Sequence, residues 1–374
     1  MSKLLSQGGF GCVFYPGIRC DDASPDDDVV TKVQNNDFNA KNEILIGSLI
    51  ENMPLYQWYF LPVINDCPIN IKKLNKESVM SCEVFSEATN KSKLNFIAMD
   101  IPYINGTDFV SLIEKSETKK SVLILSEVYR HLLTCLEKLA ELSIIHLDIK
   151  LDNILFEKNN GQPRIIDFGI SIPIENLTKK TLKTYFYAYV PEYYLWCPTI
   201  HLINFCLHES GKTLTSDDLA EVASQCVSLN RSLDMFSPDF VDKYREQLLK
   251  LFETFKGNKP TDVVDKLLKY KATWDQYSLS IMYLNILFSI FPDASNGNTF
   301  ILMFSQLLLK NIHPDPSMRL TIEETRNNFD NIFFIEGDIS TYLSLATSFN
   351  ENKTNAIDTL RDNTMIDTPY TRTT

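Results

Sequence analysis

The sequence lacks any apolar stretch long enough to cross a bilayer. Its most apolar run, Ile281–Phe291, is shorter than a transmembrane helix and carries Asn285 and Ser289, so we expect a buried core helix there. The first residues, Met-Ser-Lys-Leu-Leu-Ser, lead into glycines without the apolar region of a signal peptide. We therefore expect an intracellular, cytoplasmic protein that has no membrane partner.

Basic residues are outnumbered, because 36 lysines and arginines stand against 48 aspartates and glutamates, a formal net charge of −12. Such a surface repels a phosphate backbone, so we expect no nucleic-acid partner. The 374 residues, 44% of them hydrophobic, have ordinary globular composition and can bury a sizeable core. This length fits two or three domains, or one large bilobal unit.

Cysteine patterns that bind metals are also absent. No two of the eight cysteines form a C-x-x-C pair, and no histidine lies at zinc-finger spacing from them. Without such a pattern we expect reduced thiols, scattered through the core and surface of an intracellular protein. The cysteines are Cys12, Cys20, Cys67, Cys82, Cys135, Cys197, Cys206 and Cys226.

The first hundred residues have the short apolar runs and polar turns of strands. One helix interrupts them at residues 38–52, with Ile44, Leu45, Leu49 and Ile50 on one side. Polar loops are expected at Asp21–Asp28 and Ser86–Lys93. The predicted strands are Phe10–Tyr15, Val29–Val33, Phe60–Ile64 and Phe96–Ile101.

From Phe109 onward the pattern is mostly helical, so the chain is expected to be an α+β protein. Ser126–Leu142 carries a stripe of leucines at helical spacing, Leu132, Leu133, Leu136 and Leu139. Small strands are predicted at Ile144–Ile145, Ile154–Phe156 and Ile165–Ile166. The last residues, 337–374, are rich in Thr, Asn and Asp, a composition typical of partial disorder.

Two polar clusters carry the chemistry. The first reads His146-Leu-Asp148-Ile-Lys150-Leu-Asp-Asn153, and the second, Asp167-Phe168-Gly169, begins fourteen residues after Asn153. Phosphoryl transfer needs a carboxylate that accepts a hydroxyl proton, and an amide oxygen and a second carboxylate that hold Mg²⁺ against the phosphates. Lys150 can offset charge on the transferred group. Either cluster alone is a weak signal, but the two together, in this order and at this spacing, are specific.

This pair of clusters resembles the catalytic loop H-R-D-x-K-x-x-N and the D-F-G motif of eukaryotic-type protein kinases. The resemblance implies Asp148 as catalytic base, and Asn153 and Asp167 as ligands of Mg²⁺, with Mn²⁺ as an alternative. Lys150 matches the serine/threonine form of the loop. The family also implies a bilobal fold, with a small β-rich N-lobe over residues 1–103 and a larger helical C-lobe over 104–336, followed by the polar tail 337–374.

The N-terminus resembles the family's glycine-rich loop, G-x-G-x-x-G-x-V, with serine in the first glycine position. Ser6, Gly8, Gly9 and Gly11 are therefore expected to line the ATP phosphates. Val29-Val-Thr-Lys32 follows at the position of the family's V-A-I-K, so Lys32 should reach the α- and β-phosphates. Its expected carboxylate partner is Glu43, eleven residues later, with Glu51 as a weaker alternative.

The linker between the lobes is expected within Met99–Gly106. If Met99 were the gatekeeper residue, Pro102 would stand where an N–H should meet adenine, and proline has none. We therefore prefer Ile101 as gatekeeper, with the C=O of Pro102 and the backbone of Ile104 facing the base. The side chains expected to sandwich the adenine ring are Val13, Val30, Leu155 and Ile166.

Three later motifs resemble the family's scaffold and extend the resemblance over residues 4–336. Val190-Pro-Glu192 resembles A-P-E, and Asp315-Pro-Ser-Met-Arg319 resembles D-P-x-x-R, which implies an ion pair between Glu192 and Arg319. Trp274-Asp275-Gln-Tyr277-Ser-Leu resembles D-x-W-S-L-G, so Asp275 should brace the catalytic loop by hydrogen bonds.

The sequence departs from the family at four places. Leu147 replaces the arginine that receives an activation-loop phosphate, so we expect activity that does not need this phosphorylation. An insert at about 193–273 carries two predicted helices, Pro238–Lys256 and Thr261–Lys271, and is either a docking site for a partner or an inert elaboration. The family threonine near Thr184 is displaced by one residue. Gly47 stands where the family has a bulky residue, so either the small lobe is loosely coupled or Glu43 is misaligned.

The expected function is transfer of the γ-phosphoryl group of ATP to serine or threonine hydroxyls of a protein substrate. One alternative is a pseudokinase that binds ATP without catalysis, although all five key polar residues are present. Another is a small-molecule kinase, a class that lacks the Glu192 and Arg319 motifs. The compact frame and the Asn-, Lys- and Ile-rich composition resemble kinases of large DNA viruses. If the protein is viral, we expect it in the host cytoplasm or the virion.

Overall fold

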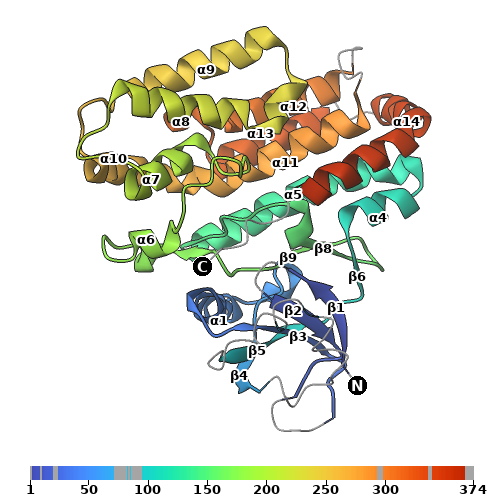
Figure 1. Ribbon diagram of the computed structural model, residues 1–374. Coiled ribbons are helices and arrows are strands. Elements are labelled where there is room, and N and C mark those ends of the chain that lie inside the picture. Colours follow the sequence, from blue (N-terminus) through green and yellow to red (C-terminus); the bar gives the residue numbers. More distant parts are fainter. Residues whose placement is uncertain are drawn as a thin grey trace. The chain divides into compact units, whose positions relative to one another are not determined.

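The computed structural model describes residues 2–8, 11–19, 24–70, 82, 85, 95–292, 298–335 and 339–366 (Figure 1). Gly9, Phe10 and the predicted loop Ser86–Lys93 lie outside these residues. The chain divides into two compact units. Among the described residues, the N-terminal unit contains those up to Thr107 together with Asn153–Ser171, and the helical unit contains Asp108–Asp152 and Ile172–Ile366. This division differs from the predicted lobes 1–103 and 104–336, because residues 153–171 pack with the N-terminal unit.

The N-terminal unit is built on a five-stranded antiparallel sheet in the order β1-β2-β3-β5-β4. Its strands are β1 (Lys3–Gln7), β2 (Gly11–Tyr15), β3 (Val29–Asn35), β4 (Asn65–Ile69) and β5 (Phe96–Pro102). The predictions of β2, β3 and β5 are confirmed, whereas β1 and β4 were not expected.

The strand predicted at Phe60–Ile64 was wrong. Phe60 forms only an isolated bridge with Ile165, and the Leu61 N–H donates to the Ile165 carbonyl at 3.0 Å. Phe60, Leu61 and Val63 are buried, so this run is apolar because it packs in the core, not because it belongs to the sheet. The strand β4 follows it, where the sequence turns polar.

A smaller sheet completes this unit, formed by β6 (Gly106–Thr107), β8 (Ile154–Glu157) and β9 (Pro163–Ile165) in the order β6-β8-β9. The Ile165 N–H donates to the Tyr59 carbonyl at 2.9 Å, next to the 3-10 helix η1 (Tyr56–Trp58). Residues 153–171 are thereby tied to the segment that precedes β4.

One face of the large sheet covers a core that contains a disulfide bond. Cys12 of β2 is bonded to Cys82, and both are fully buried beside Phe14, Phe85 and Phe96. Cys67 also takes part in a disulfide. The expectation that all the cysteines are reduced was therefore wrong for this unit, because no local spacing reveals which distant cysteines meet. The free thiols of the described residues, Cys135, Cys197, Cys206 and Cys226, are buried in the helical unit.

The other face of the sheet packs against α1 (Phe38–Glu51), whose first turn is capped by Asp37 accepting from the Ala40 N–H at 3.1 Å. The buried face of α1 differs from the predicted one, since Leu45 is 39% exposed while Asn42 and Glu43 are buried. Gly47 faces the core so closely that a Cβ atom would lie 2.1 Å from the Val63 carbonyl oxygen. The glycine therefore reflects close backbone packing of α1, so no loose coupling of this unit needs to be inferred from it.

The helical unit is organised around α11 (Trp274–Ile290), which is buried along nearly its whole length. A two-stranded sheet of β7 (Ile144–Ile145) and β10 (Ile172–Pro173) precedes and holds the start of segment 146–153. The other α-helices are α4 (Phe109–Lys115), α5 (Thr118–Glu141), α6 (Leu182–Tyr185), α7 (Pro198–His208), α8 (Ser216–Ser228), α9 (Pro238–Glu253), α10 (Pro260–Leu267), α12 (Thr299–Asn311), α13 (Ile322–Ile335) and α14 (Ile339–Ile366).

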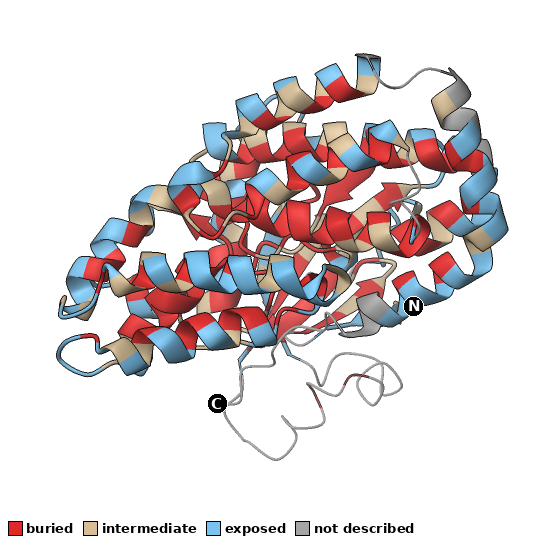
Figure 2. Ribbon diagram, turned by 90° about the horizontal axis from the view of Figure 1, so that it is seen from above, coloured by how far each residue is buried: buried red, intermediate tan, exposed pale blue. Residues whose placement is uncertain are grey.

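Short 3-10 helices connect these elements. They are η3 (Leu151–Asn153), η4 (Ile174–Asn176), η5 (Arg231–Met235), η6 (Leu268–Thr273) and η8 (Pro316–Met318). Along the outer helices, such as α8 and α9, buried and exposed residues alternate at helical spacing (Figure 2). The predicted leucine stripe of α5 is confirmed, since Leu132, Leu133, Leu136 and Leu139 are all buried.

The helices predicted within the insert are confirmed as α9 and α10. Ser237 caps α9 by accepting from the Phe240 N–H at 3.3 Å, and Pro260 is the first residue of α10. The predicted disorder of the tail was wrong for Ile339–Ile366, because these residues form α14, which packs against α5 and α11. Phe349 and Leu360 of α14 are buried, so a polar composition here conceals an amphipathic helix.

Among the described residues, no helix has both the length and the apolar character needed to cross a membrane. The run Ile281–Phe291 instead lies in the core as part of α11 and the residue after it, as predicted.

The Cys12–Cys82 disulfide yields a stability prediction. Its two cysteines are 70 residues apart, and closing a loop of that length in the unfolded chain stabilises the folded state by about 4 kcal/mol. We expect Cys82→Ala to lower the free energy of unfolding in urea by roughly that amount. The control is Cys135→Ala, which removes a buried free thiol and should cost about 1 kcal/mol. Equal losses in the two variants would contradict the prediction.

Candidate functional site

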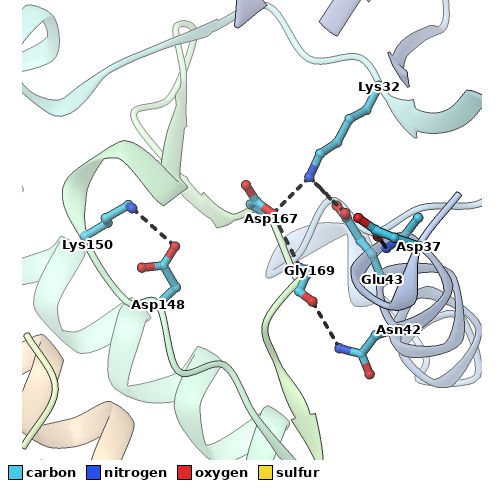
Figure 3. Close-up of polar contacts among 9 residues, drawn as sticks. Lys32, Asp37, Asn42, Glu43, Asp148, Lys150, Asp167 and Gly169 are labelled. Carbon is cyan, nitrogen blue, oxygen red and sulfur yellow. Dashed lines mark hydrogen bonds and ion pairs between the residues drawn. The ribbon is translucent and has the colours of Figure 1, made fainter. Parts of the chain in front are cut away.

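Lys32 is the centre of the polar cluster in the N-terminal unit. In the sheet register it lies beside Val13 of β2 and Met99 of β5, on the face that packs against α1. Its Nζ lies 2.8 Å from Oε2 of Glu43 and 3.0 Å from Oδ1 of Asp167 (Figure 3). The structure therefore brings together three residues that the sequence places in different motifs, and the partner of Lys32 is Glu43, not Glu51.

The electrostatics of this cluster reflect two carboxylates around one buried ammonium. Burial lowers the pKa of Lys32, but the negative charges of Asp167 and Glu43 outweigh burial and raise that pKa overall. For Glu43, burial raises the pKa to about 7, with Asp167 adding to the rise and Lys32 opposing it. Glu43 is almost inaccessible, whereas 37% of the Asp167 side chain is exposed. When both carboxylates are ionised, these three residues carry an excess of negative charge that a bound cation would offset.

The segment Asp167–Gly169 is held by α1 and by the core. Asn42 of α1 donates its Nδ2 to the carbonyls of Gly169, at 3.3 Å, and Ser171, at 2.7 Å. Phe168 is buried and packs edge-on against Phe60, with ring centroids 6.0 Å apart. Asp167 has φ 64°, a left-handed conformation that is strained for a residue with a side chain. The strain is tolerated because contacts on both sides fix the segment.

Asn153 lies next to this segment. Its backbone carbonyl accepts from the Ile166 N–H at 3.0 Å, and the residue is buried at the start of β8. Amide and carboxylate oxygens are the ligands that Mg²⁺ prefers. The described residues contain no group of three or more His, Cys, Asp or Glu side chains able to hold a metal. A metal here would thus depend on Asn153, Asp167 and oxygens of a bound phosphate, which is how Mg²⁺ is usually bound with nucleotides.

The residues predicted to enclose adenine all belong to the N-terminal unit and are all partly exposed: Val13, Val30, Leu155 and Ile166. Val30 lies beside Ile101 in the register of β3 and β5. Leu155 lies over Gly106, where a Cβ atom would approach its Cγ to 2.5 Å. Ile104 lies in the segment between β5 and β6, and its N–H and C=O have no hydrogen-bond partner in the described part of the chain.

The glycine motif lies at the turn between β1 and β2. Ser6 is exposed and lies beside Val13, and the Gly8 N–H donates to the Gly11 carbonyl at 2.9 Å. Gly11 is buried, and a Cβ atom there would lie 2.6 Å from the Val33 carbonyl oxygen. Gly11 is thus required by close packing on β3, while Gly8 has open space around it.

In the helical unit, Asp148 and Lys150 form an ion pair, with 3.2 Å between Oδ2 and Nζ (Figure 3). The loop that carries them is braced by Asp275 of α11, as predicted. The Asp275 carboxylate accepts from the N–H of His146 at 2.7 Å and from that of Leu147 at 2.8 Å. Burial raises the pKa of Asp275, and these two hydrogen bonds oppose the rise.

The predicted ion pair between Glu192 and Arg319 is absent, and this expectation was wrong. Glu192 is exposed. Arg319 is buried, donates to the His313 carbonyl at 2.9 Å and to Thr273 Oγ1 at 3.2 Å, and places its guanidinium 5.0 Å from the ring centroid of Tyr277. The guanidinium is thus held by an aromatic ring and neutral oxygens instead of a carboxylate.

Sequence reasoning missed three residues of this region. Asn42, one position before Glu43, anchors the segment after Asp167. Trp196 donates its Nε1 to the Leu147 carbonyl at 2.8 Å, which helps to fix Leu147 at φ 68°. Tyr193 donates its hydroxyl to Asp148 Oδ1. A signal existed only for Asn42, because a polar residue on the core side of a helix needs a partner. Trp196 and Tyr193 lie more than 40 residues from the loop that they contact.

Comparison with known proteins supports a protein kinase domain. Residues 69–194 match the family model described as the protein kinase domain, a range that contains Asp148, Asn153 and Asp167. The chain is 32% identical over 193 residues to a probable serine/threonine-protein kinase of Dictyostelium discoideum, which covers 50% of this chain and 36% of that protein. The fold class agrees, since the α+β arrangement of an antiparallel sheet unit and a helical unit is that of the kinase fold.

Two further relatives are more distant. The probable serine/threonine-protein kinase fnkB of D. discoideum is 26% identical over 152 residues, which is 38% of this chain and 27% of fnkB. The serine/threonine-protein kinase SKS1 of Saccharomyces cerevisiae is 27% identical over 111 residues, which is 30% of this chain and 22% of SKS1. In these three relatives the match covers between 22% and 36% of the relative's length.

The raised pKa of Glu43 predicts a pH dependence. An acid whose pKa rises on folding stabilises the folded state below its unfolded pKa of about 4.5, and this contribution is lost as the pH rises toward about 7. We expect the stability of the wild type, relative to Glu43→Gln, to fall between pH 5 and 8 by at most about 1.4 kcal/mol per pH unit.

The measurement is urea unfolding of both proteins across this pH range. The matched control is Glu51→Gln at the exposed end of the same helix, which should differ from the wild type by the same amount at every pH. A constant difference for Glu43→Gln as well would show that Glu43 stays ionised throughout.

Proposed function

We propose that this chain is a serine/threonine protein kinase that transfers the γ-phosphoryl group of Mg-ATP to hydroxyls of protein substrates. The observation that carries the proposal is the contact of Lys32 with both Glu43 and Asp167. A lysine on a sheet needs no such pair of carboxylates for stability, because two carboxylates around one ammonium place a net negative charge on these three residues when both are ionised. The arrangement suits a site that binds phosphates and a divalent cation.

In the proposed function, Lys32 contacts the α- and β-phosphates while Glu43 fixes its position. Asn153 and Asp167 hold Mg²⁺, which neutralises charge on the phosphates during transfer. Glu43 and Lys32 precede the region matched by the family model, so their proposed roles rest on the motif and on their contact in the structure.

The adenine ring is proposed to lie among Val13, Val30, Leu155 and Ile166, whose partial exposure leaves apolar surface for a ligand. Ile101 is the better gatekeeper candidate, because it lies beside Val30, whereas Met99 is fully buried beside Lys32. The Pro102 carbonyl and the backbone of Ile104 then meet the base. The partnerless N–H and C=O of Ile104 support this assignment.

For the chemical step, we propose that Asp148 accepts the proton of the substrate hydroxyl. The hydroxyl oxygen forms a bond to the γ-phosphorus as the bond to the β,γ-bridging oxygen breaks, and ADP leaves. Lys150, whose ammonium lies 3.2 Å from Asp148, offsets charge on the transferred group. The two hydrogen bonds from Asp275 hold this loop, so the carboxylate is positioned before the substrate binds.

The serine/threonine preference rests on Lys150 and on the distant relatives, which are serine/threonine kinases. The relatives named above come from a slime mould and a yeast, so the resemblance to viral kinases stays a prediction. The cytoplasmic location also stays a prediction. Disulfides are rare in reducing compartments, and this unit contains Cys12–Cys82.

The absence of the Glu192–Arg319 ion pair removes one argument against a small-molecule kinase. The argument that remains is the match of residues 69–194 to the protein kinase domain. A pseudokinase is the other alternative, and phosphate transfer in an activity assay would exclude it directly.

The first test is phosphate transfer from radiolabelled ATP to dephosphorylated casein. We expect Asp148→Asn and Asp167→Ala each to reduce transfer at least about a hundredfold, because each removes a group needed in the transition state. The matched control is Asp152→Asn, an exposed carboxylate in the same loop, which should retain activity. If the wild type binds Mg-ATP but transfers no phosphate, the chain is a pseudokinase. Phosphoserine or phosphothreonine in the product reports the hydroxyl preference.

We also propose that activity does not depend on phosphorylation of the segment after Asp167. Leu147, at the position of the family's phosphate-binding arginine, is buried and cannot pair with a phosphate.

The test is a variant with Thr178, Thr181 and Thr184 all replaced by alanine. Thr178 and Thr181 are hydrogen-bonded to each other at 3.0 Å, so folding is checked first by thermal unfolding. We expect kcat/KM to stay within about threefold of the wild type, because Leu147 offers no positive charge to a phosphate on this segment. A folded variant that has lost nearly all transfer would refute the idea.

A further inference from the structure

Both oxygens of the Asp148 carboxylate are already engaged within the helical unit. Oδ1 accepts the hydroxyl hydrogen of Tyr193, and Oδ2 lies 3.2 Å from Lys150 Nζ. Only 12% of the Asp148 side chain is exposed. A general base has to lie within hydrogen-bond reach of the proton that it accepts. In this structure, the hydroxyl that donates its proton to Asp148 is that of Tyr193, at the place where a substrate hydroxyl would have to bind.

Tyr193 is held in this position from several sides. Its ring lies 5.9 Å from Lys150 Nζ and packs edge-on against Trp196, with ring centroids 5.1 Å apart. Its backbone N–H donates to Val190 at 3.1 Å, and its carbonyl accepts from the Trp196 N–H at 3.0 Å. Since Trp196 also donates to the Leu147 carbonyl, the ring and the catalytic loop share one support.

We propose that Tyr193 competes with the substrate for Asp148, because its hydroxyl takes the position that a serine or threonine hydroxyl must take before transfer. The inference rests on the proposed function. Tyr193 then governs access of the acceptor, and it withdraws from Asp148 when a substrate binds.

The alternative is that Tyr193 only positions Asp148. The remaining contacts make that role redundant: Lys150 holds Oδ2, and Asp275 holds the backbone of the loop before Asp148. The two roles predict opposite effects of removing the hydroxyl. Loss of a competitor lowers KM for the acceptor, while loss of a positioning group lowers kcat.

The kinetic test compares the wild type with Tyr193→Phe, which removes the hydroxyl and keeps the ring against Lys150 and Trp196. We expect kcat/KM for dephosphorylated casein to rise about tenfold through a lower KM, because a hydrogen bond to a charged group no longer has to be broken. KM for ATP should not change. The matched control is Tyr189→Phe. Tyr189 lies on the same segment as Tyr193, and its hydroxyl is hydrogen-bonded to Gln225 of α8, so its removal should leave kcat and KM for casein unchanged. A lower kcat in Tyr193→Phe, or constants equal to those of the wild type, overturns the proposal.

A second measurement does not depend on kinase activity. N-acetylimidazole acetylates accessible tyrosine hydroxyls, and peptide mass spectrometry locates the product. We expect Tyr193 to react several-fold faster in Asp148→Ala than in the wild type, with Tyr189 as an internal reference that does not change. Equal rates at Tyr193 would show that the contact with Asp148 is absent, and the proposal fails.

The two measurements separate this inference from the proposed function. Transfer by the wild type that is unchanged in Tyr193→Phe refutes the inference alone. If neither the wild type nor Tyr193→Phe transfers phosphate while both bind Mg-ATP, the proposed function fails, and the inference fails with it.

Discussion

The buried contact of Lys32 with Glu43 and Asp167 is the constraint on which the N-terminal unit depends. It joins three elements at one point: β3, which carries the lysine, α1, and the segment after β9. The contact leaves one carboxylate in excess, and Asp167 is the more exposed of the two. The excess charge is costly for a purely structural cluster, whereas the partial exposure of Asp167 leaves it accessible to a ligand. A phosphate and metal site needs both features, because a bound cation compensates the excess charge.

In the helical unit, a different set of contacts fixes the loop that carries Asp148. The Asp275 carboxylate accepts from two backbone N–H groups of this loop, and Trp196 Nε1 donates to the Leu147 carbonyl. These bonds fix Leu147 in a left-handed conformation and so determine where Asp148 points. Under the proposed function, polar groups held in this way are positioned before any substrate binds, which is the usual basis of electrostatic catalysis.

The parts of the site that could be predicted are those whose residues are close in sequence or follow from strand register. The spacing from His146 to Asn153 and the position of Asp167 were informative because a short loop leaves few possible arrangements. The contact of Lys32 with Glu43 followed from one strand and the next helix. The Cys12–Cys82 disulfide could not be predicted, since it joins positions 70 residues apart. The close packing of Gly47 on Val63 likewise depends on a long-range approach.

The largest error was the Glu192–Arg319 ion pair, and the surroundings of Arg319 show what takes its place. Tyr244 of α9, within the insert, donates its hydroxyl to the Ile312 carbonyl at 3.1 Å, next to the His313 carbonyl that accepts from Arg319. Tyr277, which stands where the family has tryptophan, covers the guanidinium. The ring and these neutral acceptors occupy the place expected for the carboxylate, and Arg319 Nη2 is buried without a hydrogen-bond partner among the described residues. Glu192 is then free to remain at the surface, and Tyr193 beside it can contact Asp148. The segment that the ion pair was expected to anchor is instead connected to the catalytic loop through Tyr193 and Trp196.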